Sequence, residues 1–334
     1  MKAFVIDKYG KDIELKQVSL PTPKIHDSQL LIEIHAAGVN VLDAKLKDGD
    51  FKAVIPYKMP LILGNDLAGV VKKIGTNVTK FKIGDEVYAR PDQARIGTFA
   101  EYIAISESDV ALKPSNLTMV EAASVPLVGL TAWQALIEKA QLKAGQKVFV
   151  QAGSGGVGTI AIQLAKHLGA EVATTASSRN KELVQKLGAD IVIDYKSQDF
   201  ESVLHDYDVV LHSQNTETLQ KSLRIVKKGG MLISISGPPD PDYAKAANLP
   251  LPLRLAIKGL SLKVRQQAKK LGVDYSFLLM RASGSQLNEL SKLIESGAIK
   301  PIIDTSYQFD ETPQALKHVE SGHTTGKVVI QIKA

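Results

Sequence analysis

The segment QAGSGGVG, residues 151–158, combines residue types and a spacing that suit phosphate binding. Gly153, Gly155 and Gly158 form the pattern G-x-G-x-x-G between an apolar run, KVFV, and a helix-like run, TIAIQLAKHLG. The first glycine permits a tight turn, the second lets the backbone approach a pyrophosphate, and the third lets the helix pack closely on the sheet. Free N–H groups at a helix N-terminus favour a bound anion. The alternative is a purely structural glycine turn. We expect a dinucleotide site formed by Gly153, Gly155, Gly156, Val157 and Gly158.

The end of the following strand indicates which dinucleotide binds. NAD sites usually place an acid there, about 20 residues beyond the glycines, to bind the ribose 2′-OH. This strand ends in TTASSRNK, which supplies Ser177, Ser178 and Arg179 but no acid. Hydroxyl groups and a cation suit the 2′-phosphate of NADPH, so we expect NADPH as the cofactor. The alternative is that Arg179 is a solvated loop residue.

The pattern around these residues predicts a Rossmann domain. From residue 147 to 236, apolar strands such as 171–177 and 208–212 alternate with helices such as 156–168 and 216–226. Strands that are apolar through their centres are typical of sheets covered on both faces. Repeated strand–helix units imply a parallel, doubly wound sheet with right-handed crossovers.

The rest of the chain predicts β structure first and helices later. Short strand-like runs with turn residues between them argue for a barrel-like β domain, and they span 2–7, 13–20, 30–39, 69–75, 85–89 and 98–106. The proline-rich runs GPPDPDY (237–243) and LPLPL (249–253) break the strand–helix order. Helices are expected at 285–296 and near 312–321, with a last strand in KVVIQI.

Composition narrows the classes of function. The chain has 334 residues, 44% hydrophobic and 23% charged, as in an ordinary globular protein of two domains. It has no cysteine, which excludes disulfides and thiolate metal sites. The net charge of +6 is scattered, whereas nucleic-acid binding favours a concentrated stripe. No apolar run approaches the ~18 residues of a membrane span, and the start turns polar too soon for a secretory signal. We therefore expect a cytoplasmic protein without membrane or nucleic-acid partners.

Several segments together resemble a known family. They are, in order, AAGVNVLDAKLKDG, PLILGNDLAGVV, FKIGDEVYA, GTFAEYIAI, VPLVGLTAWQAL, the glycine-rich segment, LGADIVIDY and GHTTGKVVI. The chain resembles the zinc-independent quinone oxidoreductase branch of the medium-chain dehydrogenase/reductase superfamily, which includes zeta-crystallin-like and chloroplast-envelope quinone oxidoreductase-like proteins. The resemblance implies an α/β fold with two parts. A chaperonin-10-like, β-rich catalytic domain would comprise residues 1–121 and 267–334, and a Rossmann NADPH-binding domain residues 122–266.

The resemblance also bears on zinc. Zinc alcohol dehydrogenases have a Cys, a His and a Cys in the motifs matched here by GVNVLD, LGND and LVGLT. This chain has Asn40, Asn65 and Val128 at those positions, and these residues cannot complete a nitrogen and sulfur zinc site. We therefore expect no metal.

The resemblance implies roles for three residues at the reacting centre. Asn40 would lie near the nicotinamide and the acceptor, or it is an asparagine in a turn after a strand. Asp43 would orient a hydrogen-bond network, or it caps the helical turn that follows. Tyr57 would donate a proton to the reduced oxygen, or it is an amphipathic residue at the rim of the cleft.

The resemblance implies further cofactor contacts. Thr131 would face the nicotinamide, and Tyr195 would pack near the 2′-phosphate or adenine, unless Tyr195 is core packing. Lys327 would reach the cofactor phosphates, or it is surface charge. The remaining expected contacts are Ser213, Ser236 and Gly237 at strand ends, and Phe277 and Leu279 in a backbone segment near the carboxamide.

These expectations fit hydride transfer to an acceptor that needs no Lewis acid. Quinones and α,β-unsaturated carbonyls qualify, because hydride addition gives a phenolate or enolate that conjugation stabilises. Two alternatives stay open. One is an alkenal or enone double-bond reductase with little quinone activity. The other is an NADPH-binding regulatory or nucleic-acid-binding protein without significant turnover. The family resemblance implies a homodimer.

Overall fold

The computed structural model describes residues 1–333 and divides into two compact units. The first unit comprises residues 1–130 and the chain from Arg281 onward, and the second comprises Thr131–Met280. The expected boundaries, after residues 121 and 266, differ from these. The helix α3 (Pro126–Trp133) continues through the first boundary. The strand β14 (Asp274–Phe277) pairs with the Rossmann sheet, so residues after 266 still belong to the second unit.

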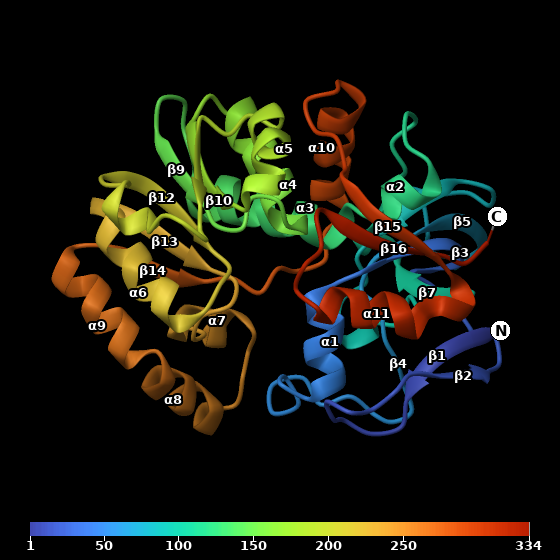
Figure 1. Ribbon diagram of the computed structural model, residues 1–334. Coiled ribbons are helices and arrows are strands. Elements are labelled where there is room, and N and C mark those ends of the chain that lie inside the picture. Colours follow the sequence, from blue (N-terminus) through green and yellow to red (C-terminus); the bar gives the residue numbers. More distant parts are fainter. Residues whose placement is uncertain (334) are drawn as a thin grey trace. The chain divides into compact units, whose positions relative to one another are not determined.

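Six parallel strands form the sheet of the second unit, as the strand–helix alternation predicts (Figure 1). Their order is β11-β10-β9-β12-β13-β14, so the first strand in the chain lies at the centre and the order reverses beside it. Ligands of such sheets bind at the carboxyl ends of the strands, at this reversal. The other strands are β9 (Lys147–Val150), β10 (Glu171–Ala176), β11 (Ile191–Asp194), β12 (Tyr207–His212) and β13 (Val226–Ser234).

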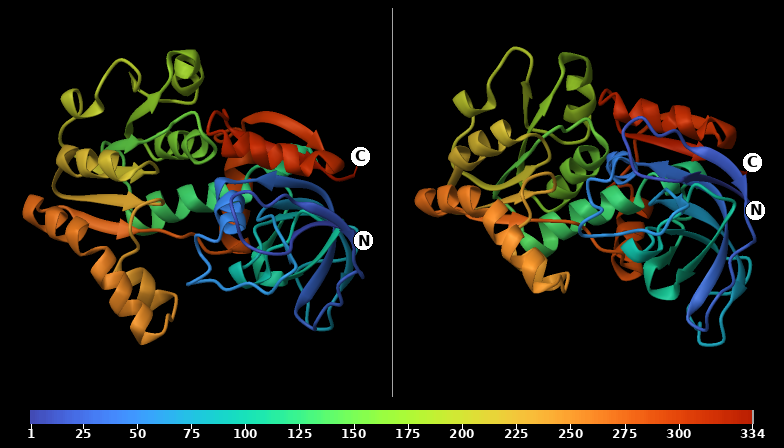
Figure 2. Two further views of the ribbon diagram at one scale, coloured as in Figure 1. Left: turned by 60° about the horizontal axis from the view of Figure 1, so that its bottom comes forward. Right: turned by 90° about the horizontal axis from the view of Figure 1, so that it is seen from below.

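Helices pack on this sheet in the expected positions and in one unexpected stretch. The expected ones are α4 (Gly156–His167), α5 (Lys181–Lys186) and α6 (Thr216–Ile225). The proline-rich stretch, expected to break the order, begins two further helices, α7 (Pro241–Ala246) and α8 (Leu251–Leu260), which α9 (Leu262–Leu271) follows. Proline is tolerated in the first turn of a helix because its missing N–H has no intrahelical acceptor there. Figure 2 shows these helices along the margin of their unit.

The first unit is mainly antiparallel β structure. Its larger sheet has the order β15-β16-β3-β5-β6-β8, with β7 also paired to β3, and its smaller sheet has the order β2-β1-β4. The strand β16 pairs with β3, so the end of the chain returns to its beginning. The strands are β1 (Lys2–Ile6), β2 (Lys16–Ser19), β3 (Gln29–Val39), β4 (Leu61–Ile62), β5 (Leu67–Ile74), β6 (Glu86–Ala89), β7 (Tyr102–Ser106), β8 (Val110–Leu112), β15 (Ile303–Gln308) and β16 (Lys327–Gln331). Its remaining helices are α1 (Val41–Asp48), α2 (Met119–Ala123), α10 (Gly284–Glu295) and α11 (Thr312–Glu320).

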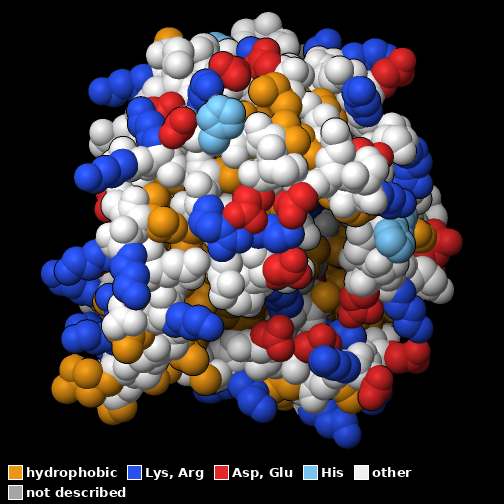
Figure 3. All heavy atoms as spheres, turned by 60° about the vertical axis from the view of Figure 1, so that its left-hand side comes forward, with side chains coloured by type: hydrophobic (Ala, Val, Ile, Leu, Met, Phe, Trp, Pro, Cys, Tyr) orange, Lys and Arg blue, Asp and Glu red, His pale blue; other side chains and the backbone are white. Residues whose placement is uncertain are grey.

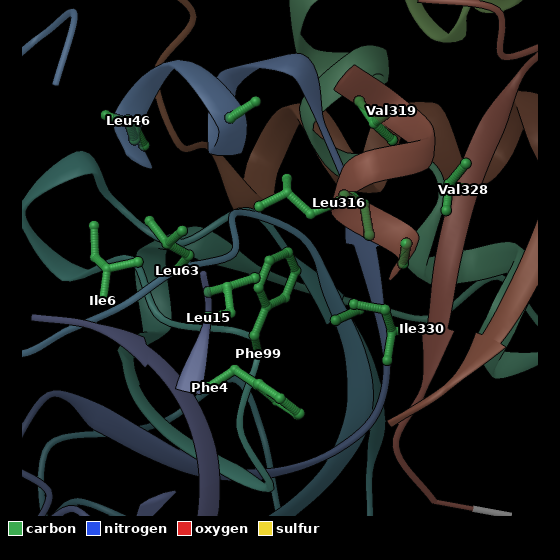
Figure 4. Close-up of a cluster of buried hydrophobic side chains, with 14 of the residues drawn as sticks. Phe4, Ile6, Leu15, Leu46, Leu63, Phe99, Leu316, Val319, Val328 and Ile330 are labelled. Atoms are coloured by element: carbon green, nitrogen blue, oxygen red, sulfur yellow. The ribbon is translucent and has the colours of Figure 1, made fainter. Parts of the chain in front are cut away.

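A hydrophobic cluster joins the two ends of the chain within the first unit (Figure 4). Phe4 of β1 stacks edge-on against Phe309, with ring centroids 5.2 Å apart. Leu316 and Val319 of α11 lie in the same cluster, one helical turn apart and on one face. The cluster anchors α11 and β16, and β16 carries a residue of the site described below.

Candidate active site

The glycine turn follows β9 and opens α4. The residue with a left-handed backbone is Ala152, with φ of 52°, whereas Gly153 does not have a positive φ. Gly153 is required for another reason, since a Cβ there would lie 2.1 Å from the Thr174 hydroxyl oxygen. A Cβ on Gly158 would lie 2.3 Å from the carbonyl oxygen of Ala152. The close approach at this glycine is therefore between α4 and the turn, whereas packing of the helix on the sheet was expected.

Gly155 differs from the other two glycines because its open side is not filled by protein. The nearest atom to a Cβ placed there is the Ala152 carbonyl oxygen, at 3.4 Å, an ordinary contact distance. Gly155 is the N-cap of α4, and the first N–H groups of a helix have no intrahelical partners. A pyrophosphate would fit against this turn, because the backbone is accessible and the helix dipole favours an anion.

The loop after β10 holds the three residues expected at a 2′-phosphate, Ser177, Ser178 and Arg179. Arg179 is exposed and makes no ion pair within residues 1–333. The structure adds a residue that sequence reasoning missed, Asp194 at the end of β11. Its carboxylate accepts hydrogen bonds from the backbone N–H groups of Ser178, at 3.1 Å, and Lys196, at 3.0 Å. The pairing of Ala176 with Asp194 brings the two strand ends together, a register that the sequence does not contain.

Tyr195 follows directly and is 59% exposed. The alternative that it is core packing is therefore wrong. Its position after β11, next to the end of β10, leaves a flat aromatic surface available beside the Arg179 loop. A role near adenine or the 2′-phosphate remains a prediction.

Three further expected cofactor residues, Ser213, Ser236 and Gly237, follow the carboxyl ends of β12 and β13. Ser213 donates its N–H to the Gln151 side chain at 3.3 Å, and the Ser236 hydroxyl donates to the Gln214 carbonyl at 2.7 Å. The N–H of Gly237 donates to the Ser234 hydroxyl at 2.7 Å. These contacts organise the strand ends.

His212, a second residue that sequence reasoning did not single out, is buried beneath these strand ends. Its Nδ1 lies 2.8 Å from the Ser234 hydroxyl. Burial lowers the pKa of His212 to about 4. The side chain is therefore neutral at physiological pH and supports the strand ends.

The backbone N–H of Phe277, one of the expected cofactor contacts, is bonded within the protein. The N–H of Phe277 donates to the Asp240 carboxylate at 2.7 Å, and the next N–H, of Leu278, donates to the Ser234 carbonyl. Phe277 is therefore held by the protein, with its ring against Tyr243. Leu279 is partly exposed and Thr131 is buried, and their cofactor roles remain predictions.

A second polar cluster, here called the Asn40 cluster, lies in the first unit and consists of Asn40, Asp43, Asn65, Asp66, Arg90 and Lys327. Four neighbouring strands position it, in the order β16-β3-β5-β6. Lys327 begins β16, Asn40 follows β3, Asp66 precedes β5 and Arg90 follows β6. Because these neighbours are antiparallel, the start of one strand lies beside the end of the next. All four residues therefore meet at the same end of the sheet.

Asn40 is buried, and its side chain forms hydrogen bonds with two charged residues. Its Nδ2 donates to Asp66 Oδ2 at 2.9 Å, and its Oδ1 accepts from the Lys327 ammonium. Lys327 also donates to the Val39 carbonyl at 3.0 Å and to Asp66 at 3.1 Å, so three N–H groups are directed at protein oxygens. Lys327 is thus not surface charge. Its ammonium is bonded to Asn40 and Asp66, and its expected contact with the cofactor phosphates remains a prediction.

Asp43 combines both of its expected roles. One carboxylate oxygen accepts the Asn40 N–H at 2.8 Å and caps α1, and the other accepts from the Asn65 side chain at 2.7 Å. Burial raises the pKa of Asp43 to about 6. Through these two hydrogen bonds the carboxylate fixes the positions of Asn40 and Asn65.

Arg90 is the residue of this cluster that sequence reasoning missed. It is 1% exposed, yet its Nε and Nη1 have no hydrogen-bond partner within residues 1–333. Its one polar contact is long, 3.5 Å from Nη2 to Asn65 Oδ1. Burial lowers the pKa of this guanidinium, with the charges of Tyr57 and Asp92 opposing that shift. A buried cation with two unpartnered donors is costly unless something else compensates it.

Tyr57 lies close enough to Arg90 that the guanidinium charge opposes part of the rise in the pKa of its phenol. Its hydroxyl donates to the Gln93 carbonyl at 2.7 Å, and burial raises its pKa to about 12. The phenol therefore holds its proton strongly and already has an acceptor. Whether it delivers that proton to a substrate remains a prediction.

Within residues 1–333, no group of three or more His, Cys, Asp or Glu side chains is placed to hold a metal ion. No helix in that part of the chain is long and apolar enough to cross a membrane.

Comparison with known proteins places the chain in a family. Residues 26–115 match the alcohol dehydrogenase GroES-like domain, and residues 187–330 match the zinc-binding dehydrogenase family. Over 99% of its length the chain is 36% identical to the 2-methylene-furan-3-one reductase of Solanum lycopersicum, of which it covers 79%. The chain belongs to the medium-chain dehydrogenase/reductase superfamily. Its resemblance to this superfamily, and the α/β fold with a GroES-like and a Rossmann-type part, are confirmed.

Two more members of this superfamily are similar over nearly the whole chain. One is the chloroplastic NADPH-dependent alkenal/one oxidoreductase of Arabidopsis thaliana, 34% identical over 99% of this chain and 79% of that protein. The other is the solved quinone oxidoreductase of Coxiella burnetii, with a TM-score of 0.84 and 31% identity, covering 100% of this chain and 99% of that one.

Proposed function

We propose that this protein is an NADPH-dependent oxidoreductase that transfers hydride to quinones or α,β-unsaturated carbonyls without a metal ion. The observation that carries the proposal is the open glycine turn at the head of α4, next to a strand end with two serines and an arginine. The relatives support the acceptor class, since their names include an alkenal/one oxidoreductase and a quinone oxidoreductase.

The second unit provides the cofactor site in this proposal. The N–H groups of Gly156, Val157 and Gly158 bind the pyrophosphate, and Ser177, Ser178 and Arg179 bind the 2′-phosphate. Bound NADPH supplies the hydride. Asp194 holds the backbone of the Arg179 loop and is itself neutralised in part by the two N–H groups that it accepts.

The first unit provides the electrostatic environment of the acceptor. The positions that hold zinc ligands in zinc alcohol dehydrogenases carry Asn40 and Asn65, and the Lys327 ammonium is bonded to Asn40. A fixed cation and amide donors stabilise negative charge that develops on an oxygen. We propose that Asn40 orients the acceptor and that the positive charge of the buried Arg90 guanidinium stabilises the enolate or phenolate oxygen without contacting it. A proton then comes from water or from Tyr57.

A direct test measures the loss of NADPH absorbance with benzoquinone, phenanthrenequinone, an alkenal and a saturated aldehyde. We expect turnover of the quinones or the alkenal, little with the aldehyde, preference for NADPH over NADH, and no effect of a chelator. Turnover of the alkenal alone would favour the double-bond reductase. Tight NADPH binding without any turnover would favour a regulatory protein, and loss of activity with a chelator would contradict the metal-free proposal.

Arg179 offers a separate test of cofactor choice. Replacing it with aspartate places an acid where NAD sites usually have one and removes the cation for the 2′-phosphate. We expect Arg179→Asp to reduce kcat/KM for NADPH by about tenfold or more, with kcat/KM for NADH unchanged or higher. The matched control is Lys181→Asp, an exposed cation two residues further on. Equal losses for both variants, or none for Arg179→Asp, would contradict the assignment.

The proposal also includes a cytoplasmic location and assembly as a homodimer. The strand β14 lies at the edge of the six-stranded sheet and has one paired neighbour there, which leaves an edge that a second copy could extend. Sedimentation velocity tests the dimer directly.

A further inference from the structure

The helices α8 and α9 expose an unusual amount of hydrophobic surface. Eleven large hydrophobic side chains are exposed in the described chain, and five of them fall in this one stretch of 21 residues. They are Leu251 (68% exposed), Leu255 (60%), Leu260 (67%), Leu262 (45%) and Leu271 (39%). A contiguous exposed apolar patch in a folded protein marks an interaction site more often than scattered single residues do.

The exposed leucines do not result from a poorly packed helix pair. Ile257 of α8 and Val264 and Ala268 of α9 are buried. By helical spacing these residues lie opposite Leu251, Leu255 and Leu262, whereas Leu260 and Leu271 lie beside the buried stripe. Ser261, at the junction of the two helices, is also fully buried and its hydroxyl donates to the Ile257 carbonyl at 2.9 Å. The helices therefore have a packed inner face and, opposite it, three leucines that no part of the described chain covers.

The charge of the same stretch has a single sign. Between Asp242 and Asp274 the sequence has seven basic residues and no acid. Four lysines, Lys258, Lys263, Lys269 and Lys270, are exposed on α8 and α9 and make no ion pair within residues 1–333. In Figure 3, hydrophobic side chains lie together with Lys and Arg side chains at the lower left of the view.

The combination of leucines and unpaired lysines favours one kind of binding partner for α8 and α9. Two copies of this chain joined by the face would bring lysines against lysines, and like charges in an interface are costly. An anionic lipid surface complements both features, because acyl chains accept the leucines and headgroup phosphates attract the lysines. We propose that α8 and α9 dock the protein peripherally on anionic membranes. This revises the expectation of no membrane partner and does not rest on the proposed function.

Vesicle sedimentation tests the proposal with the full-length protein. The probes are vesicles of phosphatidylcholine alone and of phosphatidylcholine with phosphatidylglycerol, at low and high salt. We expect binding only with phosphatidylglycerol and weakening with salt, since surface charge attraction is screened. Both Leu251→Ser/Leu255→Ser/Leu260→Ser and Lys258→Glu/Lys263→Glu/Lys269→Glu should weaken the partition coefficient by about tenfold or more.

Matched controls change the same residue types elsewhere. Ile83→Ser/Val203→Ser removes exposed apolar side chains, and Lys24→Glu/Lys73→Glu/Lys80→Glu reverses three exposed charges. They should bind vesicles as the wild type does, and thermal unfolding verifies that every variant is folded. Equal losses in control and test variants, or no binding to phosphatidylglycerol vesicles, would overturn the proposal. A wild-type dimer that the leucine variant converts to a monomer, without vesicle binding, would assign the face to a second copy instead.

Discussion

Replacing Arg90 with methionine is expected to reduce reductase turnover by about 10²-fold while the protein stays as stable as the wild type or becomes more stable. The loss follows if the guanidinium charge stabilises the oxyanion, because one preorganised electrostatic group contributes about that factor. The unchanged stability follows because Nε and Nη1 lack partners and the side chain is buried. A methionine has a similar length without the cost of burying a charge. The measurements are kcat at saturating NADPH and the free energy of unfolding in urea.

The controls separate this role from a structural one. Arg95→Met removes an exposed arginine five residues further on and should change neither quantity. Arg90→Lys keeps a cation with a different donor geometry and should retain part of the activity. A variant Arg90→Met that unfolds more readily yet keeps the wild-type kcat would show that Arg90 supports Asn65 and does not act on the substrate.

The sequence was sufficient where structure depends on local order. The glycine turn, the strand before it and the helix after it occupy neighbouring positions in the chain, so spacing and periodicity predicted them. The return of the C-terminal strand to the first unit was left open by composition. The prolines of LPLPL predicted a break in the strand–helix order, but α8 begins there. Proline breaks a helix in its interior and is accepted in its first turn.

The Asn40 cluster could not be predicted from spacing. Lys327 and Asn40 lie 287 residues apart and meet only because β16 pairs with β3. Arg90 stands in an unremarkable run, YARP, and what distinguishes it is the lack of partners after folding. Asp194 likewise reaches the Arg179 loop through the register of β10 and β11. Each of these contacts depends on strand order, which a single sequence leaves undetermined.

The two glycines Gly155 and Gly158 should respond to the same added methyl group in opposite ways. In Gly155→Ala the new Cβ meets nothing closer than 3.4 Å, so the fold tolerates it, at a cost of at most about 1 kcal/mol for the weaker N-cap. The methyl group occupies the side where the pyrophosphate would approach, and NADPH affinity should fall by about tenfold or more, which is about 1.4 kcal/mol.

In Gly158→Ala the Cβ would lie 2.3 Å from the Ala152 carbonyl oxygen and 2.7 Å from the Gly153 Cα, so the backbone must move. We expect a loss of about 1–3 kcal/mol in the free energy of unfolding. Calorimetric titration with NADPH and urea unfolding measure both variants. If Gly155→Ala binds NADPH as the wild type does, the phosphates do not lie on this turn. If Gly158→Ala is as stable as the wild type, the helix does not depend on that close approach. Only the crossed result, with affinity lost in one variant and stability in the other, assigns the turn its two separate roles.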